Sequence, residues 1–199
     1  MAVTNVLISG VGGQGTILAS NVLADVALRS GLDVKQSEVH GMSQRGGNVV
    51  SMVRFGERVA SPLVVQGEAD ILLAFEEMEA LRYIAWLRPA GRALINRQTI
   101  NPAPVNAGLA QYPAEIEKTL RAAHPGTLFI DATRIAIEMG NVRVANVILL
   151  GAMSLSLGFP LGTWDAALRG SVPPKAADLN LRAFRRGQEI AAAGAGLPA

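Results

Sequence analysis

The sequence predicts an α/β fold, a three-layer Rossmann-like architecture with a largely parallel sheet and helices on both faces. Short apolar runs alternate along the chain with helix-like stretches, the pattern that favours a sheet covered by crossover helices. The first apolar run passes into a helix through closely spaced glycines. Residues 70–75 are almost continuously apolar, which is typical of a parallel strand buried on both faces.

The N-terminal part of the chain is expected to form a strand, a helix and a second strand. The buried strand is expected at 4–9 and the helix at 14–30, ending at Gly31. The inner side of this helix is expected to carry Ile17, Leu18, Val22, Val26 and Leu28. The second strand falls at 33–38, where Val34 is the one strongly apolar residue.

The rest of the chain continues the alternation within a single domain, 1–199. The next elements predicted are a strand at 48–55, a turn at 61–63, a strand at 70–75, a helix at 76–87 stopped by Pro89 and Gly91, and a strand at 93–95. After an irregular region punctuated by prolines come a helix at 114–123, a strand at 128–131, a helix at 132–139, an apolar helix at 144–157, and a final helix from Pro173 to about 192. Gly151 suggests that the apolar helix packs closely against another backbone, and residues 192–199 are expected to be a mobile tail.

The amino-acid composition limits the classes of protein to which the chain can belong. Half of the 199 residues are hydrophobic and 17% are charged, against about 25% charged in an average soluble domain. So little surface charge predicts a buried interface with a partner, with a compact alanine-rich monomer as the alternative. The formal charge of +2 is spread along the chain, which argues against nucleic-acid binding, and Arg182, Arg185 and Arg186 are read as a solvated or interfacial helix face.

The chain has no cysteine and two histidines. It therefore cannot supply disulfides, a thiolate zinc site, a cysteine nucleophile or ordinary iron–sulfur ligands. His40 and His124 have no paired-carboxylate motif beside them, so no metal site is expected on this chain. There is no basic N-terminal signal region and no apolar run of about 20 residues, and the expectation is a cytoplasmic protein outside the membrane.

Residues 10–15, called the glycine turn below, are the first candidate site. Gly10, Gly12 and Gly15 fit the G-x-G-x-x-G spacing, in which the missing side chains permit a tight turn and close approach of a phosphate. Gly13 and Gln14 complete the turn. Uncapped N–H groups at the start of the helix favour an anion there. Alternatively, the glycines only allow the helix to pack tightly on the sheet.

Residues 38–47 are the second candidate site, expected as a loop at the carboxyl side of the sheet, where open α/β sheets bind ligands. The polar groups of this segment are Glu38, His40, Gln44 and Arg45, followed by Gly46 and Gly47. The forked donors of Arg45 suit a carboxylate or phosphate. His40 either transfers a proton near neutral pH or bonds a loop carbonyl and orders the segment.

A dinucleotide site would need an acidic residue about 20 positions beyond the glycines to hold a ribose hydroxyl. Asp33 and Glu38 are available by position, but the polar residues between them argue against a standard nicotinamide site. A free-standing nucleotide-binding oxidoreductase therefore stays an alternative, as does a purely structural interaction module.

Taken together, these residues resemble the gamma-type subunit or domain of the 2-oxoacid:ferredoxin oxidoreductases. The resemblance covers nearly the whole chain and rests on the runs at 10–15, 38–47, 61–63, 69–76, 112–113 and 146–152, with Asn180, Ala183, Phe184 and Gly187. Within that family, the His-Gly-Met-Ser-Gln form of residues 40–44 resembles the beta subunit of the indolepyruvate branch. Gamma subunits that act on pyruvate or 2-oxoglutarate stay open as alternatives.

The resemblance implies the oxidative decarboxylation of an aryl 2-oxoacid such as indolepyruvate. Coenzyme A and oxidised ferredoxin are the co-reactants, and acyl-coenzyme A, carbon dioxide and reduced ferredoxin are the products. It also implies that thiamine diphosphate, Mg and the iron–sulfur clusters sit on a larger alpha subunit, with this chain as a non-redox component that is not active alone. For the segment 38–47 we form the hypothesis that it closes over the partner's substrate or coenzyme A channel. Arg45 would be the anion contact there, and His40 and Gln44 would shape the loop; the alternative is that the loop only cements the subunit interface.

Overall fold

The computed structural model describes residues 3–41 and 47–195 and has a mixed six-stranded sheet at its centre. The strands are β1 (Thr4–Val11), β2 (Asp33–His40), β3 (Asn48–Gly56), β4 (Ala69–Ala74), β5 (Leu87–Asn96) and β6 (Leu128–Ile130), in the spatial order β2-β3-β1-β4-β5-β6. In this sheet β1, β4, β5 and β6 pair in parallel, and β3 pairs antiparallel with both β1 and β2. The prediction of a largely parallel α/β sheet is confirmed, with the β2–β3 hairpin as its exception.

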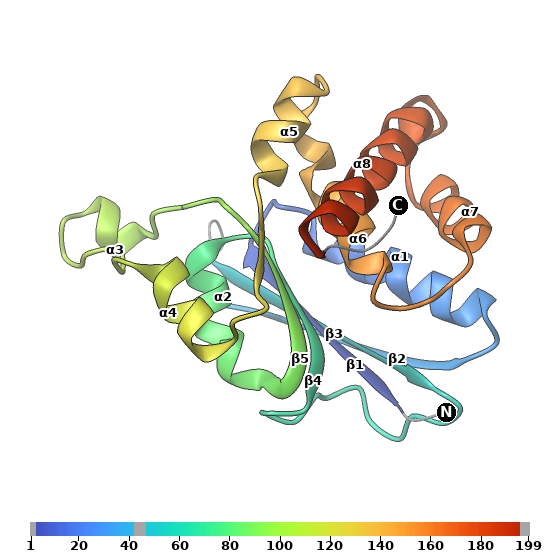
Figure 1. Cartoon of the computed structure of the whole chain (residues 1–199), viewed down its shortest axis with the longest axis horizontal. Helices are drawn as coiled ribbons and strands as arrows, with labels where there is room; N and C mark the ends of the chain where they lie inside the picture. The colour runs from blue at the N-terminus through green and yellow to red at the C-terminus, as the bar shows by residue number, and fades with distance from the viewer. Residues whose placement is uncertain (1–2, 42–46, 196–199) are drawn as a thin grey trace.

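Helices cover both faces of the sheet (Figure 1). One face is covered by α1 (Thr16–Arg29), α5 (Ala132–Glu138), α6 (Ala145–Ser154), α7 (Leu161–Ser171) and α8 (Ala177–Ala195). The other face carries α2 (Glu77–Tyr83) and α4 (Ile116–Ala123). The remaining helical segments are the short α3 (Ala103–Asn106) and the 3-10 turns η1 (Ile84–Trp86), η2 (Val142–Val144) and η3 (Pro174–Ala176).

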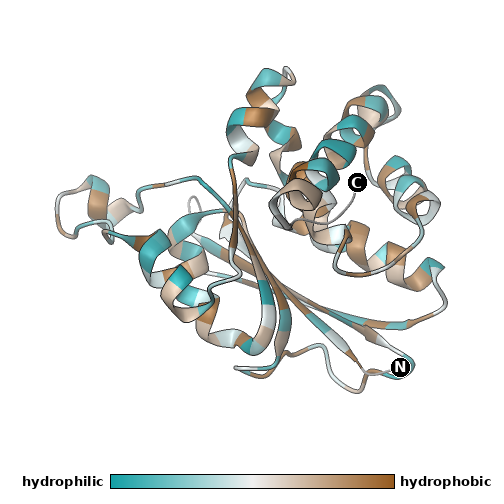
Figure 2. Ribbon diagram, viewed as in Figure 1, coloured by the Kyte–Doolittle hydropathy of each residue, from teal (hydrophilic) through white to brown (hydrophobic). Residues whose placement is uncertain are grey.

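The core is divided by the sheet into two apolar clusters, one beneath each helical layer. Val6, Ile8, Leu73 and Val53 point toward the larger helical layer, whereas Leu7 and Leu72 point toward α2 and α4. This alternation is the period-2 pattern of strands buried on both faces. Figure 2 shows hydrophobic residues concentrated on the central strands and on α6, with more hydrophilic residues on α4 and α8.

The position of β2 in the sheet accounts for its polar sequence. It is the edge strand of the sheet, pairs only with β3 among the described residues, and has no fully buried residue. Gln36 donates hydrogen bonds to Ser20 Oγ and Asn21 Oδ1 of α1, at 2.9 and 3.0 Å. A polar side chain therefore replaces the apolar contact that a central strand would make with this helix.

Two predictions in the N-terminal half are wrong. Ile17 and Leu28 of α1 are 43% and 57% exposed, because the buried stripe of the helix runs instead through Ala19, Val22, Leu23, Val26 and Ala27. The helix predicted at 76–87 is shorter in the structure, because α2 ends at Tyr83 and the 3-10 turn η1 follows as far as Trp86. The strand β5 then runs through Pro89 and Gly91. These two residues lie where the pairing of β4 with β5 shifts register, the kind of irregularity at which a strand tolerates proline and glycine.

In the C-terminal half the helix α7 lies outside every predicted element, although it buries Trp164 completely. The predicted close packing of Gly151 is confirmed, because a Cβ there would lie 2.0 Å from the Phe184 carbonyl oxygen of α8. The final helix extends to Ala195, three residues beyond the predicted end. The remainder of the expected tail, residues 196–199, lies outside the described residues.

Candidate functional site

The crevice between β1 and β4 lies where the sheet changes its winding direction. The chain leaves β1 for α1 on one face, and it leaves β4 for α2 on the other face. Since β1 and β4 are parallel neighbours, their carboxyl ends border a crevice between two diverging connections. Open α/β sheets bind ligands at such a place. The sheet topology therefore puts the glycine turn at the candidate site.

Two glycines of the turn are required by packing. A Cβ on Gly10 would lie 2.9 Å from Gln14 Oε1 and 3.0 Å from the Cβ of Phe75. A Cβ on Gly15 would lie 2.3 Å from Asn146 Nδ2, and φ of Gly15 is 86°, in the region that favours glycine. At these two positions the glycines allow close contact with the sheet and with α6, in agreement with the packing interpretation.

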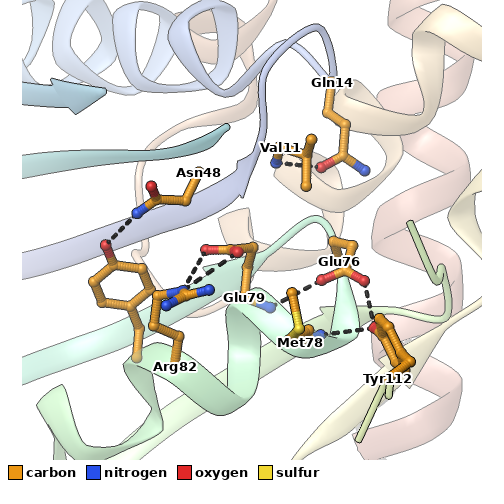
Figure 3. A network of polar contacts seen from close by, with 9 residues as sticks. Val11, Gln14, Asn48, Glu76, Met78, Glu79, Arg82 and Tyr112 are labelled. Carbon is orange, nitrogen blue, oxygen red and sulfur yellow. Dashed lines mark hydrogen bonds and ion pairs between the residues drawn. The ribbon is translucent and has the colours of Figure 1, made fainter. Parts of the chain in front are cut away.

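The other two glycines of the turn are open to solvent. Gly13 has a φ of 98° and no atom within 4 Å of a hypothetical Cβ. Gly12 donates its N–H to the Gly47 carbonyl oxygen at 2.9 Å, which joins the turn to the end of the 38–47 segment. The Val11 N–H donates to Gln14 Oε1 at 2.7 Å, so the turn is closed by its own side chain (Figure 3).

A network of amide and hydroxyl groups links the glycine turn to the ends of β4 and β5. Gln14 Nε2 donates to the Phe75 carbonyl oxygen at 2.8 Å and to Gln98 Oε1 at 3.0 Å. Asn96 Nδ2 and the Thr133 hydroxyl donate to the same Gln98 oxygen, at 3.0 and 2.9 Å. Because one acceptor receives three donors from different elements, the floor of the crevice is fixed in one arrangement.

The crevice opens into a cleft of about 590 Å³. Its walls come from the glycine turn, the ends of β4 and β5, the start of α5, the segment 141–149 and the segment 172–180. None of the described residues that line it is acidic, whereas Arg143 and Lys175 are cations. Asn146, which is 5% exposed, also lines the cleft, and its Oδ1 is buried without a hydrogen-bond partner.

The second candidate segment is partly strand. Glu38 and His40 lie at the end of β2, and their side chains contact each other at 2.7 Å between Oε1 and Nε2. Among the described residues His40 therefore has a carboxylate partner, and the expected bond to a loop carbonyl stays a prediction because residues 42–46 lie outside the described residues. Gly41 N–H donates to the Asn48 carbonyl oxygen at 2.8 Å and closes the base of the segment. Gln44, Arg45 and Gly46 lie outside the described residues.

Asp33 lies far from the glycine turn. It starts β2, at the amino edge of the sheet, where it accepts hydrogen bonds from Lys35 Nζ and, at 2.8 Å, from the Val59 N–H. Those hydrogen bonds lower the pKa of Asp33. A ribose held at the glycine turn would therefore be out of its reach, and Glu38 is already paired with His40.

Glu76 is an organising residue that the sequence interpretation placed only in the first turn of a helix. Its side chain is fully buried and caps α2 by accepting the Glu79 N–H at 2.9 Å. Its other oxygen accepts the Ile100 N–H at 3.0 Å and the Tyr112 hydroxyl (Figure 3). Tyr112 in turn accepts the Met78 N–H at 3.1 Å. The Glu76 carboxylate therefore holds both ends of the segment 100–112 against α2.

Burial and the neighbouring carboxylates set the electrostatics on this side of the sheet. Burial, followed by the hydrogen bond to Glu76, raises the pKa of the Tyr112 hydroxyl. Burial also raises the pKa of Glu79, although Arg82 contacts it at 3.3 Å. Asn48 donates to the Tyr83 hydroxyl at 3.2 Å, which ties α2 to the start of β3 (Figure 3).

Four residues at the site were not among the predicted site residues, namely Glu76, Arg143, Asn146 and Lys175. A buried strand followed directly by a glutamate at a helix start was the available signal for Glu76. Arg143 and Lys175 precede α6 and α8, and nothing in their local sequence reports that these helix starts share one cleft.

Among residues 3–41 and 47–195, no group of three or more His, Cys, Asp or Glu side chains could hold a metal ion. In the same ranges, no helix is long and apolar enough to cross a membrane.

Comparison with known proteins finds relatives that match over nearly the whole chain. The family model for pyruvate ferredoxin/flavodoxin oxidoreductase matches residues 5–190. The indolepyruvate oxidoreductase subunit IorB of Thermococcus kodakarensis is 46% identical over 94% of this chain and 95% of the relative.

Two solved structures share the fold. The gamma subunit of a keto/oxoacid ferredoxin oxidoreductase from Geobacter sulfurreducens has a TM-score of 0.71 and 28% identity, and covers 96% of this chain and 99% of its own. The 2-oxoglutarate:ferredoxin oxidoreductase of Magnetococcus marinus, solved with 2-oxoglutarate, coenzyme A and succinyl-CoA bound, has a TM-score of 0.73 and 23% identity. The match covers 97% of this chain and 32% of that longer chain.

Proposed function

Because this chain belongs to the pyruvate ferredoxin/flavodoxin oxidoreductase family, we propose that it is the non-redox subunit of a 2-oxoacid:ferredoxin oxidoreductase of the indolepyruvate type. The observation that carries the proposal is the 46% identity to an indolepyruvate oxidoreductase subunit over nearly the full length of both chains. The alternative of a free-standing nicotinamide enzyme has no support from Asp33, which lies at the opposite edge of the sheet from the glycine turn.

In the proposed reaction an aryl 2-oxoacid and coenzyme A give an acyl-coenzyme A and carbon dioxide, and the electrons released pass to ferredoxin. Thiamine diphosphate with Mg and iron–sulfur clusters supply the decarboxylation and electron transfer. Without cysteine this chain offers no thiolate for such clusters, so we place both cofactors on a larger partner subunit. The role of this chain is to bind the larger subunit and to contribute polar groups from the carboxyl edge of its own sheet.

Reconstitution tests this assignment. We expect the chain to co-purify with a large cysteine-rich subunit, and ferredoxin reduction to require both polypeptides. Turnover should be fastest with indolepyruvate and other aryl 2-oxoacids, and slower with pyruvate or 2-oxoglutarate. A preference for pyruvate or 2-oxoglutarate would assign the chain to another branch of the family. Ferredoxin reduction by this chain alone would overturn the proposed division of labour.

On sequence grounds we further propose that the 38–47 segment contacts the partner's substrate or coenzyme A channel, with Arg45 as the anion contact and His40 and Gln44 shaping the segment. The bond from Gly12 N–H to the Gly47 carbonyl oxygen supports this placement, because it brings the end of the segment to the crevice at the carboxyl edge.

Arg45→Ala in the assembled complex distinguishes a ligand contact from an interface contact. A ligand contact predicts intact assembly and a higher KM for coenzyme A or for the 2-oxoacid. A purely interfacial segment predicts loss of the complex on size-exclusion chromatography with unchanged kinetics in the fraction that assembles. Arg134→Ala is the matched control, because Arg134 is exposed on α5 and pairs with Glu138 of the same helix.

A further inference from the structure

A second cavity lies at the amino edge of the sheet, opposite the edge that carries the glycine turn. It is lined by Thr4, Asp70 and Arg88, which lie at the starts of the parallel strands β1, β4 and β5. Its other wall includes residues 156–160, which connect α6 to α7. The volume is about 850 Å³, within the roughly 300–1,000 Å³ of small-molecule sites. Since it shares no lining residue with the cleft beside the glycine turn, this amino-edge cavity is a separate feature of the molecule.

One side of the amino-edge cavity is aromatic and aliphatic. Phe55 and Phe159 both line it, with their ring centroids 5.4 Å apart. Phe159 also packs against the buried Trp164, at 6.2 Å between ring centroids. Leu32 and Leu157 extend this apolar lining. Because aromatic rings stabilise one another in tilted and edge-to-face pairs, and because Phe159 is only partly buried, the cavity offers a place for one more aromatic ring.

The charged side chains of the amino-edge cavity are mainly cations. The cations are Arg29, Arg88 and Arg92, and the one carboxylate in the lining is Asp70. Both oxygens of Asp70 are engaged, one by Arg88 Nε at 2.7 Å and the other by the Asn5 N–H at 2.7 Å. A concave surface whose charge is mostly of one sign concentrates counter-ions of the opposite sign. The cavity therefore favours an anionic ligand.

Arg92 is the cation of this cavity that is left without a carboxylate. Arg29 pairs with Asp25 at 2.7 Å and Arg88 pairs with Asp70, whereas Arg92 takes part in no ion pair within residues 3–41 and 47–195. Its Nη1 donates to the hydroxyl of Ser156 at 3.1 Å, across from β5 to the connection between α6 and α7. The other donors of this guanidinium fork suit a carboxylate.

We infer that the amino-edge cavity binds a small aromatic carboxylate, with its ring against Phe159 and its carboxylate at Arg92. Both groups come from one continuous lining, so a single ligand with a ring and a negative charge satisfies both sides. The inference goes beyond the proposed function, because no described residue of the glycine turn or of the 38–47 segment lines this cavity. The site would be a second place on the molecule at which an aryl acid binds.

Calorimetric titration of the full chain with matched small acids tests the ligand class. We expect saturable binding of indole-3-acetate, and binding of the neutral indole-3-acetamide that is weaker by about 5-fold or more, because the charged hydrogen bond is lost. Phenylacetate should bind about 3-fold more tightly than cyclohexylacetate, which has the same carboxylate and a ring without a π face. Absence of saturable indole-3-acetate binding at millimolar concentration, or equal binding of the acid and its amide, would overturn the inference.

A variant and amide NMR spectra locate the bound acid. Arg92→Gln should weaken the binding of indole-3-acetate by about 5-fold or more. The control Arg134→Gln should bind as the unaltered chain does, because Arg134 is exposed on α5 and lies outside the cavity. Circular dichroism establishes that both variants are folded.

On titration with indole-3-acetate, the amide signals of residues 29–32 and 156–160 should shift, and those of residues 13–15 and 141–146 should not. Shifts confined to the second set, or binding unchanged in Arg92→Gln, would contradict a site at the amino edge. These measurements use no partner subunit and no ferredoxin, so their failure is distinguishable from a failure of the proposed function.

Discussion

Gly15 and Asn146 are 131 positions apart in the sequence and in direct contact in the structure. Asn146 Nδ2 donates to the Gly15 carbonyl oxygen at 3.4 Å, and a Cβ on Gly15 would lie 2.3 Å from that nitrogen. The start of α6 therefore packs against the turn that follows β1. The glycine turn consequently serves packing as well as any ligand, and the two roles can be separated by substitution.

Gly15→Ala should lower the free energy of unfolding by about 3 kcal/mol. An alanine at a φ of 86° costs about 1–2 kcal/mol, and overpacking against Asn146 costs typically 1–3 kcal/mol. Urea denaturation followed by circular dichroism measures the change. Gly13→Ala is the matched control, because Gly13 has a φ of 98° and no neighbour within 4 Å of a Cβ. It should lose only the backbone contribution.

A double variant isolates the contact. Asn146→Ala removes the side chain that a Cβ on Gly15 would meet, so the loss in Gly15→Ala/Asn146→Ala should be smaller than the two single losses together. Strict additivity of the three measurements would contradict the packing role assigned to this pair.

Gly151→Ala and Gly187→Ala should each be more disruptive than an ordinary helix substitution. A Cβ on Gly151 would lie 2.0 Å from the Phe184 carbonyl oxygen, and one on Gly187 would lie 1.9 Å from the Ile148 carbonyl oxygen. Since both obstacles are backbone atoms, α6 and α8 would have to move apart. We expect a loss of about 3 kcal/mol or more, seen as a melting temperature lower by about 6–12 °C.

The control for the helix crossing is Gly170→Ala in α7, where no atom lies within 4 Å of a Cβ. There the substitution should raise stability by about 0.5–1 kcal/mol, because alanine is the better helix former. A similar loss at positions 151, 187 and 170 would show that helix propensity, and not the close approach of α6 and α8, governs these glycines.

The sequence was sufficient for the six strands and for most of the helices because the signals are local. The apolar run at 70–75 predicted β4, and Gly151 predicted a close backbone contact. The ends of the helices and strands were harder to predict from the sequence. Pro89 and Gly91 usually stop a helix, but here they lie at a register shift within β5, which depends on how β4 pairs. The helix α7 lacked a clear local pattern because it has a glycine next to each end, Gly162 and Gly170.

The site was predicted only where its residues are close together in the sequence. The glycine turn was found from its spacing, and the structure puts it at the switch point of the sheet. Asn146, Arg143 and Lys175 join the same cleft through the packing of α6 and α8, a tertiary relation that no local pattern carries. The Glu76–Tyr112 contact spans 36 positions and was missed for the same reason.

Tyr112→Phe should destabilise the chain by about 2 kcal/mol. The substitution removes the hydroxyl that donates to the buried Glu76 carboxylate, and it leaves the Met78 N–H without its acceptor. Hydrogen bonds to charged groups are worth about 1.5–3 kcal/mol, so the melting temperature should fall by roughly 4–8 °C. Amide hydrogen exchange should become faster in the segment 100–112, because the Tyr112–Glu76 hydrogen bond holds this segment against α2.

Tyr83→Phe provides the comparison for that loss. The Tyr83 hydroxyl accepts a hydrogen bond at 3.2 Å from the neutral Asn48 amide, so its removal should cost about 1 kcal/mol or less. Equal losses in the two variants, or exchange that rises throughout the protein instead of at 100–112, would contradict the anchoring role of Glu76.

Glu79→Gln should stabilise the chain in a pH-dependent manner. Burial raises the pKa of Glu79 in the folded state, so the protonated carboxyl is favoured by folding. That contribution is fully present below the unfolded pKa of about 4.3 and is lost as the pH rises through the folded pKa. The neutral glutamine avoids the loss. The melting temperature of the variant should therefore match that of the unaltered chain near pH 4 and exceed it at neutral pH.

Glu117→Gln should show the opposite sign and so serves as the internal comparison. The hydrogen bond from Arg97 lowers the pKa of Glu117, so its ionised form contributes stability above the unfolded pKa, and this contribution is lost as the pH falls through the folded pKa. The variant should melt below the unaltered chain at neutral pH and approach it in acid. Thermal unfolding followed from pH 4 to pH 8 measures both differences. A Glu79→Gln variant that melts lower at neutral pH would mean that the Arg82 contact outweighs the burial of the Glu79 carboxylate.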